Sequence, residues 1–554
     1  MRTRSKILLS AIISSTFILA ILYKTGIYFE TNDDRIIAEI LSGTFMGAGD
    51  AHVVYVNYLL ALPLALLYSL TTNVPWYGGM LVLFQFICFF MISWSTIDRC
   101  TTKKYIVFMT VILSLFFLLN IYVLAMIQYT STAAMLALAG YACLILQKGK
   151  RKAFVLFGIM ELLAYLLRSQ AMLMIQPIGG SIYLLLCLME QYSFRIKGKE
   201  ILKWGLIISS VIVLGFVGDV LGYHDEEWRK YEKFNEARTA IFDFYGSPDY
   251  YEVEHILKKY NVSEKEYNAF CDYIILNWEV PSECVGELAE FARLQNEIEF
   301  HELGERIIKN FQNIRFMGIL KAGICLWVCS MGWVLFQCRW RLFPPLLVLI
   351  VTYTGIVVYL LYQGRTPERV MYPLTIGLSL FVIILQWRDF TENGTKVWML
   401  GYILLCGLIW GRLCTDAGMI QYRTVKENNS RQQIYIEGLV EIREYCNKNL
   451  DNCYLLDSWS FCYYRGSAFD SRLYSQANCT LTGSWYSNSP VLRRHLKDYI
   501  NQEQHTLCLI IYGSDESENS TAVHFLQEKT GKVAELAERL TVSHGGEYHV
   551  YRFE

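Results

Sequence analysis

Long apolar runs are the feature that most limits what this chain can fold into. A helix needs about 20 mostly apolar residues to cross a bilayer, and eleven runs approach or reach that length. Charged residues make up 18% of the chain and the mean hydropathy is +0.28, whereas about a quarter of a soluble globular domain is charged. We therefore expect a polytopic α-helical membrane protein with about 11 transmembrane helices. The runs lie near residues 7–23, 79–97, 105–124, 130–147, 153–168, 172–189, 202–221, 316–337, 343–362, 371–388 and 397–413.

The first run, 7–23, follows the basic segment MRTRSK and resembles a signal peptide. No A-x-A-like cleavage site follows it, so we expect an uncleaved membrane anchor. A further apolar stretch, 53–70, contains Asn57 and Pro63 and is ambiguous. Its status depends on which side of the membrane each loop occupies.

The distribution of Lys and Arg assigns the loops to two sides, because positive charges in short loops concentrate on the cytoplasmic side. If 53–70 does not cross, six segments share the side of the N-terminus and hold eighteen Lys and Arg, against five in the opposite short loops. A crossing by 53–70 would place every basic loop after the first outside. We therefore interpret 53–70 as a re-entrant or interfacial helix in a multi-pass protein of the cell membrane, with a cytoplasmic N-terminus and an extracytoplasmic C-terminus. The six segments are 1–6, 98–104, 147–152, 190–203, 338–341 and 388–396, and the opposite loops are 24–78, 125–130, 168–171 and 363–369.

Two polar parts then face outward. Residues 223–315 form an outer insertion with helical patterning, which holds 20 Asp and Glu against 11 Lys and Arg. Residues 414–554 alternate helix-like and strand-like runs, as in a small α/β domain. We therefore divide the chain into a transmembrane module, 1–413, whose first outer loop is 24–78, and an extracytoplasmic α/β domain, 414–554. The helix-like runs are 434–450 and 491–500, and the strand-like runs are 453–457, 506–513 and 548–553.

Several chemistries have no signal in this sequence. The net charge of −1 gives no basic field for nucleic acid. The chain has no Walker A motif and no GxGxxG after a strand, so chemistry driven by ATP or NAD has no support. HExxH and GxSxG are also missing. The sixteen cysteines form no CxxC pair and no zinc-ligand spacing.

Two adjacent carboxylates, Asp33 and Asp34, follow the first apolar run by about ten residues. They fit the start of a helix, since Thr31 or Asn32 could cap it and acids in the first turn suit the helix dipole. They also fit a general base or metal ligand that points into an outward cavity. The remaining candidates for substrate contact in the same loop are Arg35, Asp50 and His52.

Arginines in apolar or outer segments are the second group of candidates. Arg168 ends the fifth run in LLRSQ, where it faces a cavity or extends to the interface, and Gln170 follows as a candidate for substrate contact. Arg365 and Arg369 share a short outer loop, where they bind a phosphate or anchor the loop at the interface. Two more candidates lie in the insertion, where Asn235 and Arg238 are three residues apart on one helical face.

This arrangement resembles the GT-C superfamily of membrane glycosyltransferases, which includes protein O-mannosyltransferases, aminoarabinose transferases of lipid A and mycobacterial arabinosyltransferases. The shared plan is a cytoplasmic N-terminus, an acidic motif in the first outer loop and many spans. Eleven spans with a large outer insertion after the seventh look like the O-mannosyltransferase layout. The acidic motif corresponds to Asp33-Asp34, which is nearer the arabinosyltransferase style than the usual Asp-Glu pair of mannosyltransferases. The resemblance covers most of residues 1–413.

The resemblance implies a sugar donor linked to polyprenyl phosphate and a transfer that inverts the anomeric carbon. Asp33 would take the proton of the acceptor hydroxyl, with Asp34 orienting it or binding the acceptor. Arg168, Arg365 and Arg369 would bind the phosphate of the lipid. Some relatives use a divalent metal ion, so Asp33 and Asp34 could instead be ligands of Mg²⁺ or Mn²⁺. The acceptor would be a cell-surface glycan, a lipid or a protein.

Three other functions remain open as hypotheses. A transporter or flippase for a lipid-linked saccharide would also need arginines in the membrane, although the two halves show no repeat. A polysaccharide polymerase also has many spans and arginine-rich outer loops, but it has no special need for adjacent acids beside the first span. A non-catalytic membrane protein could display residues 414–554 for binding.

Overall fold

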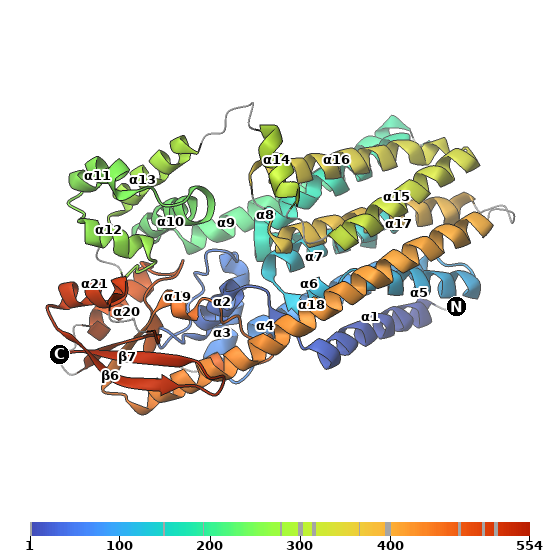
Figure 1. Cartoon of the computed structure of the whole chain (residues 1–554). Coiled ribbons are helices and arrows are strands. Elements are labelled where there is room, and N and C mark those ends of the chain that lie inside the picture. The colour runs from blue at the N-terminus through green and yellow to red at the C-terminus, as the bar shows by residue number, and fades with distance from the viewer. Residues whose placement is uncertain are drawn as a thin grey trace.

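The structure is a computed structural model that describes residues 3–147, 150–191, 193–276, 280–296, 303–312, 317–364, 366–393, 400–474, 478–500, 505–514 and 519–554. Within these ranges eight helices are long and apolar enough to cross a membrane. They lie side by side in an elongated array (Figure 1), which is the architecture of a polytopic helical membrane protein. They are α1 (Thr3–Thr25), α4 (Trp76–Asp98), α7 (Tyr129–Leu146), α8 (Arg151–Met189), α9 (Phe194–Gly222), α15 (Met317–Gln337), α16 (Phe343–Tyr362, preceded by the short turn Trp340–Leu342) and α17 (Glu368–Asn393).

Helix α7 is the centre of the array, and every one of its residues is buried. It packs against α4, α8 and α17. Its sequence, TSTAAMLALAG, is rich in small residues, which let neighbouring helices approach closely where no water drives apolar association. A hydrogen bond of 3.0 Å from Gln85 to Thr132 also links α4 to α7.

Helix α8 is a hairpin of two arms that meet at Arg168. The backbone of Arg168 is not helical, with φ −161° and ψ 98°. Glu161 and Gln176, fifteen residues apart, form a hydrogen bond of 2.9 Å, whereas a continuous helix would separate them by about 22 Å. The chain therefore reverses direction at Arg168, as the two predicted runs 153–168 and 172–189 require.

Segments that the sequence assigns to one side of the membrane lie together at one end of the array. Lys6 donates to the carbonyl oxygen of Asp98 at 2.7 Å, and Lys150 pairs with the Asp98 carboxylate at 2.9 Å. Arg388 pairs with Glu190 at 2.6 Å. The N-terminus lies at this end, and the C-terminus lies at the opposite end (Figure 1).

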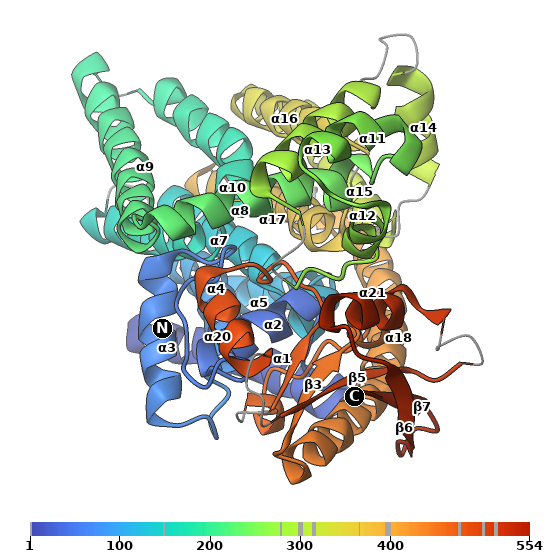
Figure 2. The same ribbon diagram turned by 90° about the vertical axis from the view of Figure 1, so that its left-hand side faces the viewer.

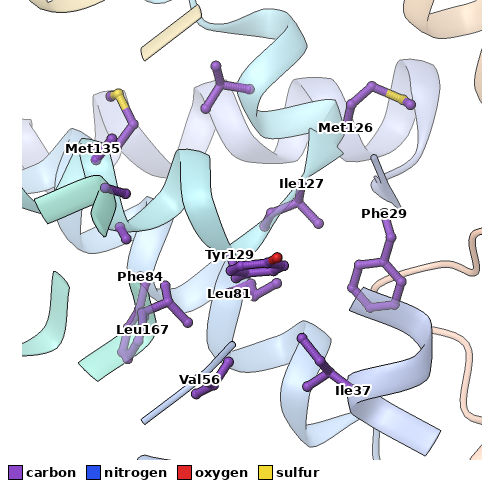
Figure 3. Packing of buried hydrophobic residues seen from close by; sticks show 14 of the residues in the cluster. Phe29, Ile37, Val56, Leu81, Phe84, Met126, Ile127, Tyr129, Met135 and Leu167 are labelled. Carbon is purple, nitrogen blue, oxygen red and sulfur yellow. The ribbon is translucent and has the colours of Figure 1, made fainter. Parts of the chain in front are cut away.

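The loop after α1 forms one short strand and two helices at the end of the array away from the N-terminus, and the strand pairs in parallel with a second strand between α6 and α7. The strands are β1 (Tyr28–Phe29) and β2 (Met126–Ile127), and the helices are α2 (Asn32–Ser42) and α3 (Tyr58–Leu70). Figure 3 shows Tyr129 near Ile127 and Leu81, with Phe29 and Ile37 nearby. This apolar packing connects α2 to the ends of α4 and α7.

Two predicted runs form helices shorter than a full crossing. The run 53–70 gives α3, whose 13 residues extend about 20 Å against the roughly 30 Å of a hydrocarbon core. The run 105–124 forms two helices, α5 (Lys103–Leu118) and α6 (Ile121–Ala125), with a turn at Leu119 and Asn120 between them.

The insertion between α9 and α15 is helical, as predicted, and has its own apolar core, which includes Leu257 and Leu288. A π-helical turn, η1 (Ala240–Tyr245), directly follows its first helix. The helices are α10 (Glu226–Thr239), α11 (Tyr250–Lys259), α12 (Glu264–Cys271), α13 (Ser282–Gln295) and α14 (Leu303–Gln312).

The C-terminal domain is attached through α18 (Leu400–Lys448), which is 49 residues long. The predicted boundary at 413/414 falls inside this helix, because the apolar sequence changes to an amphipathic one without a proline to end the helix. The five-stranded sheet has the order β4-β3-β5-β7-β6, with β3, β4 and β5 parallel and the other two antiparallel. Its strands are β3 (Asn452–Leu456), β4 (Cys479–Leu481), β5 (Thr506–Tyr512), β6 (Ala534–Thr541) and β7 (Glu547–Phe553), and its helices are α19 (Ser458–Phe461), α20 (Pro490–Ile500) and α21 (Thr521–Thr530).

The insertion and the C-terminal domain contact each other above the end of the array (Figure 2). The backbone N–H of Ile275 donates to the carbonyl of Thr482 at 2.9 Å, and the Tyr231 hydroxyl donates to the carbonyl of Trp485 at 2.6 Å. Gly483 lies so close to the insertion that a Cβ there would be 1.7 Å from the carbonyl oxygen of Tyr273. Glycine is therefore needed for this approach.

Candidate functional site

A cavity of about 300 Å³ lies where four parts of the chain meet. The start of α2 contributes Asp33, and α17 contributes Arg369. The insertion contributes Asp243 and Tyr273. The C-terminal domain contributes residues after β3 and β4, among them Trp459. Figure 2 shows α2 between the insertion and this domain.

Asp33 faces this cavity without a protein partner. Its side chain is half-buried, and no hydrogen bond or ion pair reaches it from the described residues. Thr31 occupies the N-cap position of α2 but its side chain makes no capping hydrogen bond. Burial raises the pKa of the Asp33 carboxyl, while the positive charges of Arg369, Arg168 and Arg238 act in the opposite direction. The carboxylate is thus available to a ligand.

Asp34 has a different environment, although it is the next residue. It is fully buried and accepts hydrogen bonds from the Tyr77 hydroxyl at 2.8 Å and from the backbone N–H of Tyr129, in the first turn of α7, at 3.2 Å. Burial raises its pKa well above the ordinary value, against the hydrogen bond from Tyr77. Adjacent helical residues point about 100° apart, and here one carboxyl faces the cavity while the other connects α2 to α4 and α7.

Arg369 and Arg168 supply positive charge beside Asp33. Arg369 is the second residue of α17 and lines the cavity. Arg168, at the turn of the α8 hairpin, lies with its guanidinium 5.1 Å from the ring of Tyr55 and 5.6 Å from that of Tyr129. Within the described ranges neither arginine has a carboxylate within ion-pair distance, so both can bind an anion. The third predicted arginine, Arg365, lies outside the described residues.

The two candidates of the insertion are brought to this site indirectly. Arg238 is buried, and donates to Asn235 at 3.0 Å and to the Tyr273 hydroxyl at 2.7 Å. Tyr273 lines the cavity and has a left-handed backbone, with φ 64°, a conformation that costs about 1 kcal/mol or more for a residue other than glycine. Asp243 projects from a π-helical turn, a feature found often at functional sites. Asn235 and Arg238 therefore position Tyr273.

Four residues predicted to contact substrate have other partners or positions. The guanidinium of Arg35 pairs with Glu39 at 3.2 Å, although part of the residue borders the cavity. Asp50 and His52 bond to each other at 2.6 Å and do not line the cavity. Gln170 is exposed beyond the turn of the α8 hairpin and is also absent from the lining. Asp50, His52 and Gln170 therefore lie outside the cavity, whereas Arg35 borders it with its guanidinium paired to Glu39.

Asp50 and His52 instead connect parts of the chain at this end of the array. The Tyr486 hydroxyl donates to Asp50, and His52 bonds to the carbonyl of Gly222 at 3.0 Å and stacks on Trp228 with the ring centres 4.0 Å apart. Burial acts to raise the pKa of Asp50, but hydrogen bonds from His52 and Tyr486 outweigh it and lower the pKa. This cluster connects the loop after α1 to α9, the insertion and the C-terminal domain.

The sequence did not single out Glu30, which lies close to Arg369. Glu30 is 8% exposed, and its nearest hydrogen-bond donor is the Tyr122 hydroxyl at 3.5 Å. Tyr122 also donates to Glu368. Burial raises the pKa of Glu30 to about 8, while Arg369 acts to lower it. A carboxyl that keeps its proton near neutral pH thus sits beside the candidate anion site.

The sequence also missed the lining that comes from the C-terminal domain, namely Ser458, Trp459, Ser484 and Trp485. More than 400 residues separate these positions from Asp33 in the chain. The only signal was that they follow strands, because the loops after parallel strands share one edge of a sheet. The predicted C-terminal domain thus belongs to the candidate site.

The residues do not fit a preformed site for the divalent metal ion that the resemblance implies. In the part of the chain that the structure describes, no three His, Cys, Asp or Glu side chains are placed to hold a metal ion. Asp34 is engaged by Tyr77 and Tyr129, so it does not converge with Asp33.

The fold and this site define a polytopic helical membrane protein in which the loop after α1, α17, the insertion and the C-terminal domain line a common cavity. Among the described residues, Asp33 and Arg369 in this lining have no ion-pair partner. No family model matches the chain, and no curated protein and no solved structure matches it either.

Proposed function

We propose that the protein is a membrane glycosyltransferase of GT-C-like architecture, with about eleven spans, a cytoplasmic N-terminus and an extracytoplasmic cavity. It transfers a sugar from a polyprenyl-phosphate donor to an acceptor hydroxyl outside the cell membrane. The observation that carries the proposal is Asp33, a carboxylate that has no partner among the described residues and lines a cavity together with Arg369. A base and an anion site are the two things this transfer needs.

The chemistry follows from these positions. The acceptor oxygen attacks the anomeric carbon from the face opposite the phosphate, and the bond between that carbon and the phosphate oxygen breaks. Asp33 takes the proton of the acceptor hydroxyl. Arg369 and Arg168 stabilise the negative charge of the departing lipid phosphate. One displacement inverts the configuration at the anomeric carbon.

The environment of Asp33 suits a base. Burial raises the pKa of its carboxyl, which makes the carboxylate a stronger proton acceptor, and the positive charges of the neighbouring arginines act against that rise. Tyr273, which Arg238 holds in place, and Trp485 border the same space and can contact the sugar.

The test is to incubate the purified protein with polyprenyl-phosphate sugars and measure the polyprenyl phosphate released. Asp33→Asn should lower turnover by about 10²–10⁴-fold, because a general base is lost. The structure allows Asp33→Asn to fold, since Asp33 makes no hydrogen bond with the described residues. Asp34→Asn is the matched control, with partial retention of the hydrogen bonds to Tyr77 and Tyr129 and a smaller loss of turnover expected.

Near-normal turnover in both variants would remove the carboxylate mechanism. No release from any donor by the wild-type protein, combined with movement of a lipid-linked saccharide across vesicles, would favour a transporter or flippase. Formation of a polymer from lipid-linked repeats would favour a polysaccharide polymerase.

A further inference from the structure

A second cavity, of about 620 Å³, lies on the C-terminal domain and differs in character from the first. Five tyrosines, one tryptophan and one histidine form most of its lining. None of the described residues that line it is Asp, Glu, Lys or Arg. We propose that this aromatic cleft binds a neutral saccharide chain.

The rim of the aromatic cleft is made of aromatic rings that water reaches. Trp459, Tyr463 and Tyr512 are 56%, 70% and 54% exposed. A sugar ring has an apolar C–H face and hydroxyls around its edge. An aromatic ring can cover that face, while hydroxyl groups of protein and water bind the edge. Exposed aromatic residues gathered at one concave place are a typical sign of a binding site.

The floor of the aromatic cleft is fixed by packing. The hydroxyls of Tyr464 and Tyr548 are hydrogen-bonded to each other, and the ring of Phe461 stacks on both, with centroids 5.5 Å and 5.3 Å away. The ring of Tyr512 meets that of Tyr548 edge-on at 5.5 Å. Rigid rings lose little conformational entropy when a ligand binds.

The position of the aromatic cleft in the sheet supports a binding role independently. Trp459 lies in α19, directly after β3, and Tyr512 is the last residue of β5. From β3 the chain proceeds to β4 on one side and then returns to β5 on the other, as the order β4-β3-β5 shows. Open α/β sheets bind ligands outside the carboxyl ends of the strands at this kind of switch point.

The aromatic cleft also adjoins the first cavity, because Trp459 lines both. A saccharide chain bound in the cleft can therefore extend one end toward Asp33. This second step rests on the proposed function and makes the bound chain the acceptor. The absence of charged residues from the described lining favours a neutral chain over a phosphorylated or nucleotide ligand.

The experiment measures binding by the full-length protein in lipid nanodiscs, with neutral tetrasaccharides of glucose, galactose, mannose and arabinose as probes. At least one should bind at millimolar concentration or below. Tyr463→Ala and Tyr512→Ala should each weaken that binding about tenfold, and Tyr463→Phe should retain most of it because the ring remains. Tyr251→Ala, at a 79% exposed tyrosine of the insertion, is the matched control and should bind like wild type.

Failure of all four tetrasaccharides to bind, or equal binding by Tyr463→Ala and Tyr251→Ala, would overturn the assignment. Displacement of the tetrasaccharide by an unglycosylated peptide would overturn it in favour of a protein ligand. Release of polyprenyl phosphate is measured separately, once with the tetrasaccharides as acceptors and once with water as the only acceptor. Tetrasaccharide binding without release of polyprenyl phosphate would refute the proposed function and leave the aromatic cleft as a saccharide site. Release without tetrasaccharide binding would refute the saccharide site and leave the proposed function standing.

Discussion

Replacement of Glu30 by glutamine should stabilise the folded protein, and more so as the pH rises. Glu30 is 8% exposed and one of its oxygens has no hydrogen-bond partner within the described residues. Burial raises its pKa to about 8 from the ordinary value of 4.5. The stabilisation that the protonated carboxyl provides is fully present below about pH 4.5 and is lost as the pH rises through about 8.

The size of the stabilisation follows from the difference between the pKa of Glu30 in the folded protein and its ordinary value. Each pKa unit corresponds to about 1.4 kcal/mol, so ionisation of Glu30 lowers the free energy of unfolding by about 5 kcal/mol at most. Glutamine is neutral at every pH and nearly the same shape, so Glu30→Gln avoids this cost. We expect its melting temperature to exceed that of wild type by several degrees near pH 9 and by little near pH 5.

The assay is thermal unfolding in detergent at both pH values, followed by intrinsic fluorescence. Glu252→Gln is the control, because it removes an exposed carboxyl of the insertion. The same melting difference between Glu30→Gln and wild type at both pH values would refute the reasoning, since it would show that Glu30 does not gain its charge in this range.

Three further predictions concern the site and the topology. Gly483→Ala should separate the insertion from the C-terminal domain, because its Cβ would lie 1.7 Å from the Tyr273 carbonyl oxygen. Turnover of the donor should then fall about 10²-fold. Wild-type turnover would contradict the close contact between Gly483 and Tyr273. Gly286→Ala, which meets nothing within 4 Å, is its control. Arg369→Lys should weaken retention of labelled polyprenyl phosphate about tenfold, since an ammonium cannot replace the two-pronged guanidinium, and unchanged retention would remove Arg369 from the anion site. Reporters fused after residues 30 and 75 should report the same side of the membrane, and one fused after residue 102 the other side; opposite results at 30 and 75 would make 53–70 a true span.

The membrane helices were predictable because length and hydropathy alone determine which runs can cross a bilayer. The run 79–97, for example, lies inside α4. Strands β3, β5 and β7 were also predicted, and the sequences of β5 and β7 are rich in β-branched and aromatic residues. Strand β6 was missed because its sequence, AELAERLT, favours a helix. Its pairing with β7 across the sheet overrides that local preference.

The site was predictable only in part. Asp33 and Arg369 stood out because charges beside apolar runs are costly. Arg35 was predicted to contact substrate, but its guanidinium is bound by Glu39, which lies one helical turn later. The contribution of Trp459 depends on contacts between distant segments, and no local pattern in one sequence encodes them.

Helix α18 connects the C-terminal domain to the membrane helices rigidly, without a flexible linker. Its 49 residues extend about 74 Å, and β3, which leads to Trp459, follows directly from its end. A tilt of about 5° at the membrane would move the far end by about 6 Å over this length. Helices tilt when bilayer thickness changes, so a change in the thickness of the surrounding lipid would strain the buried ion pair between Arg443, near the far end of α18, and Glu39 of α2.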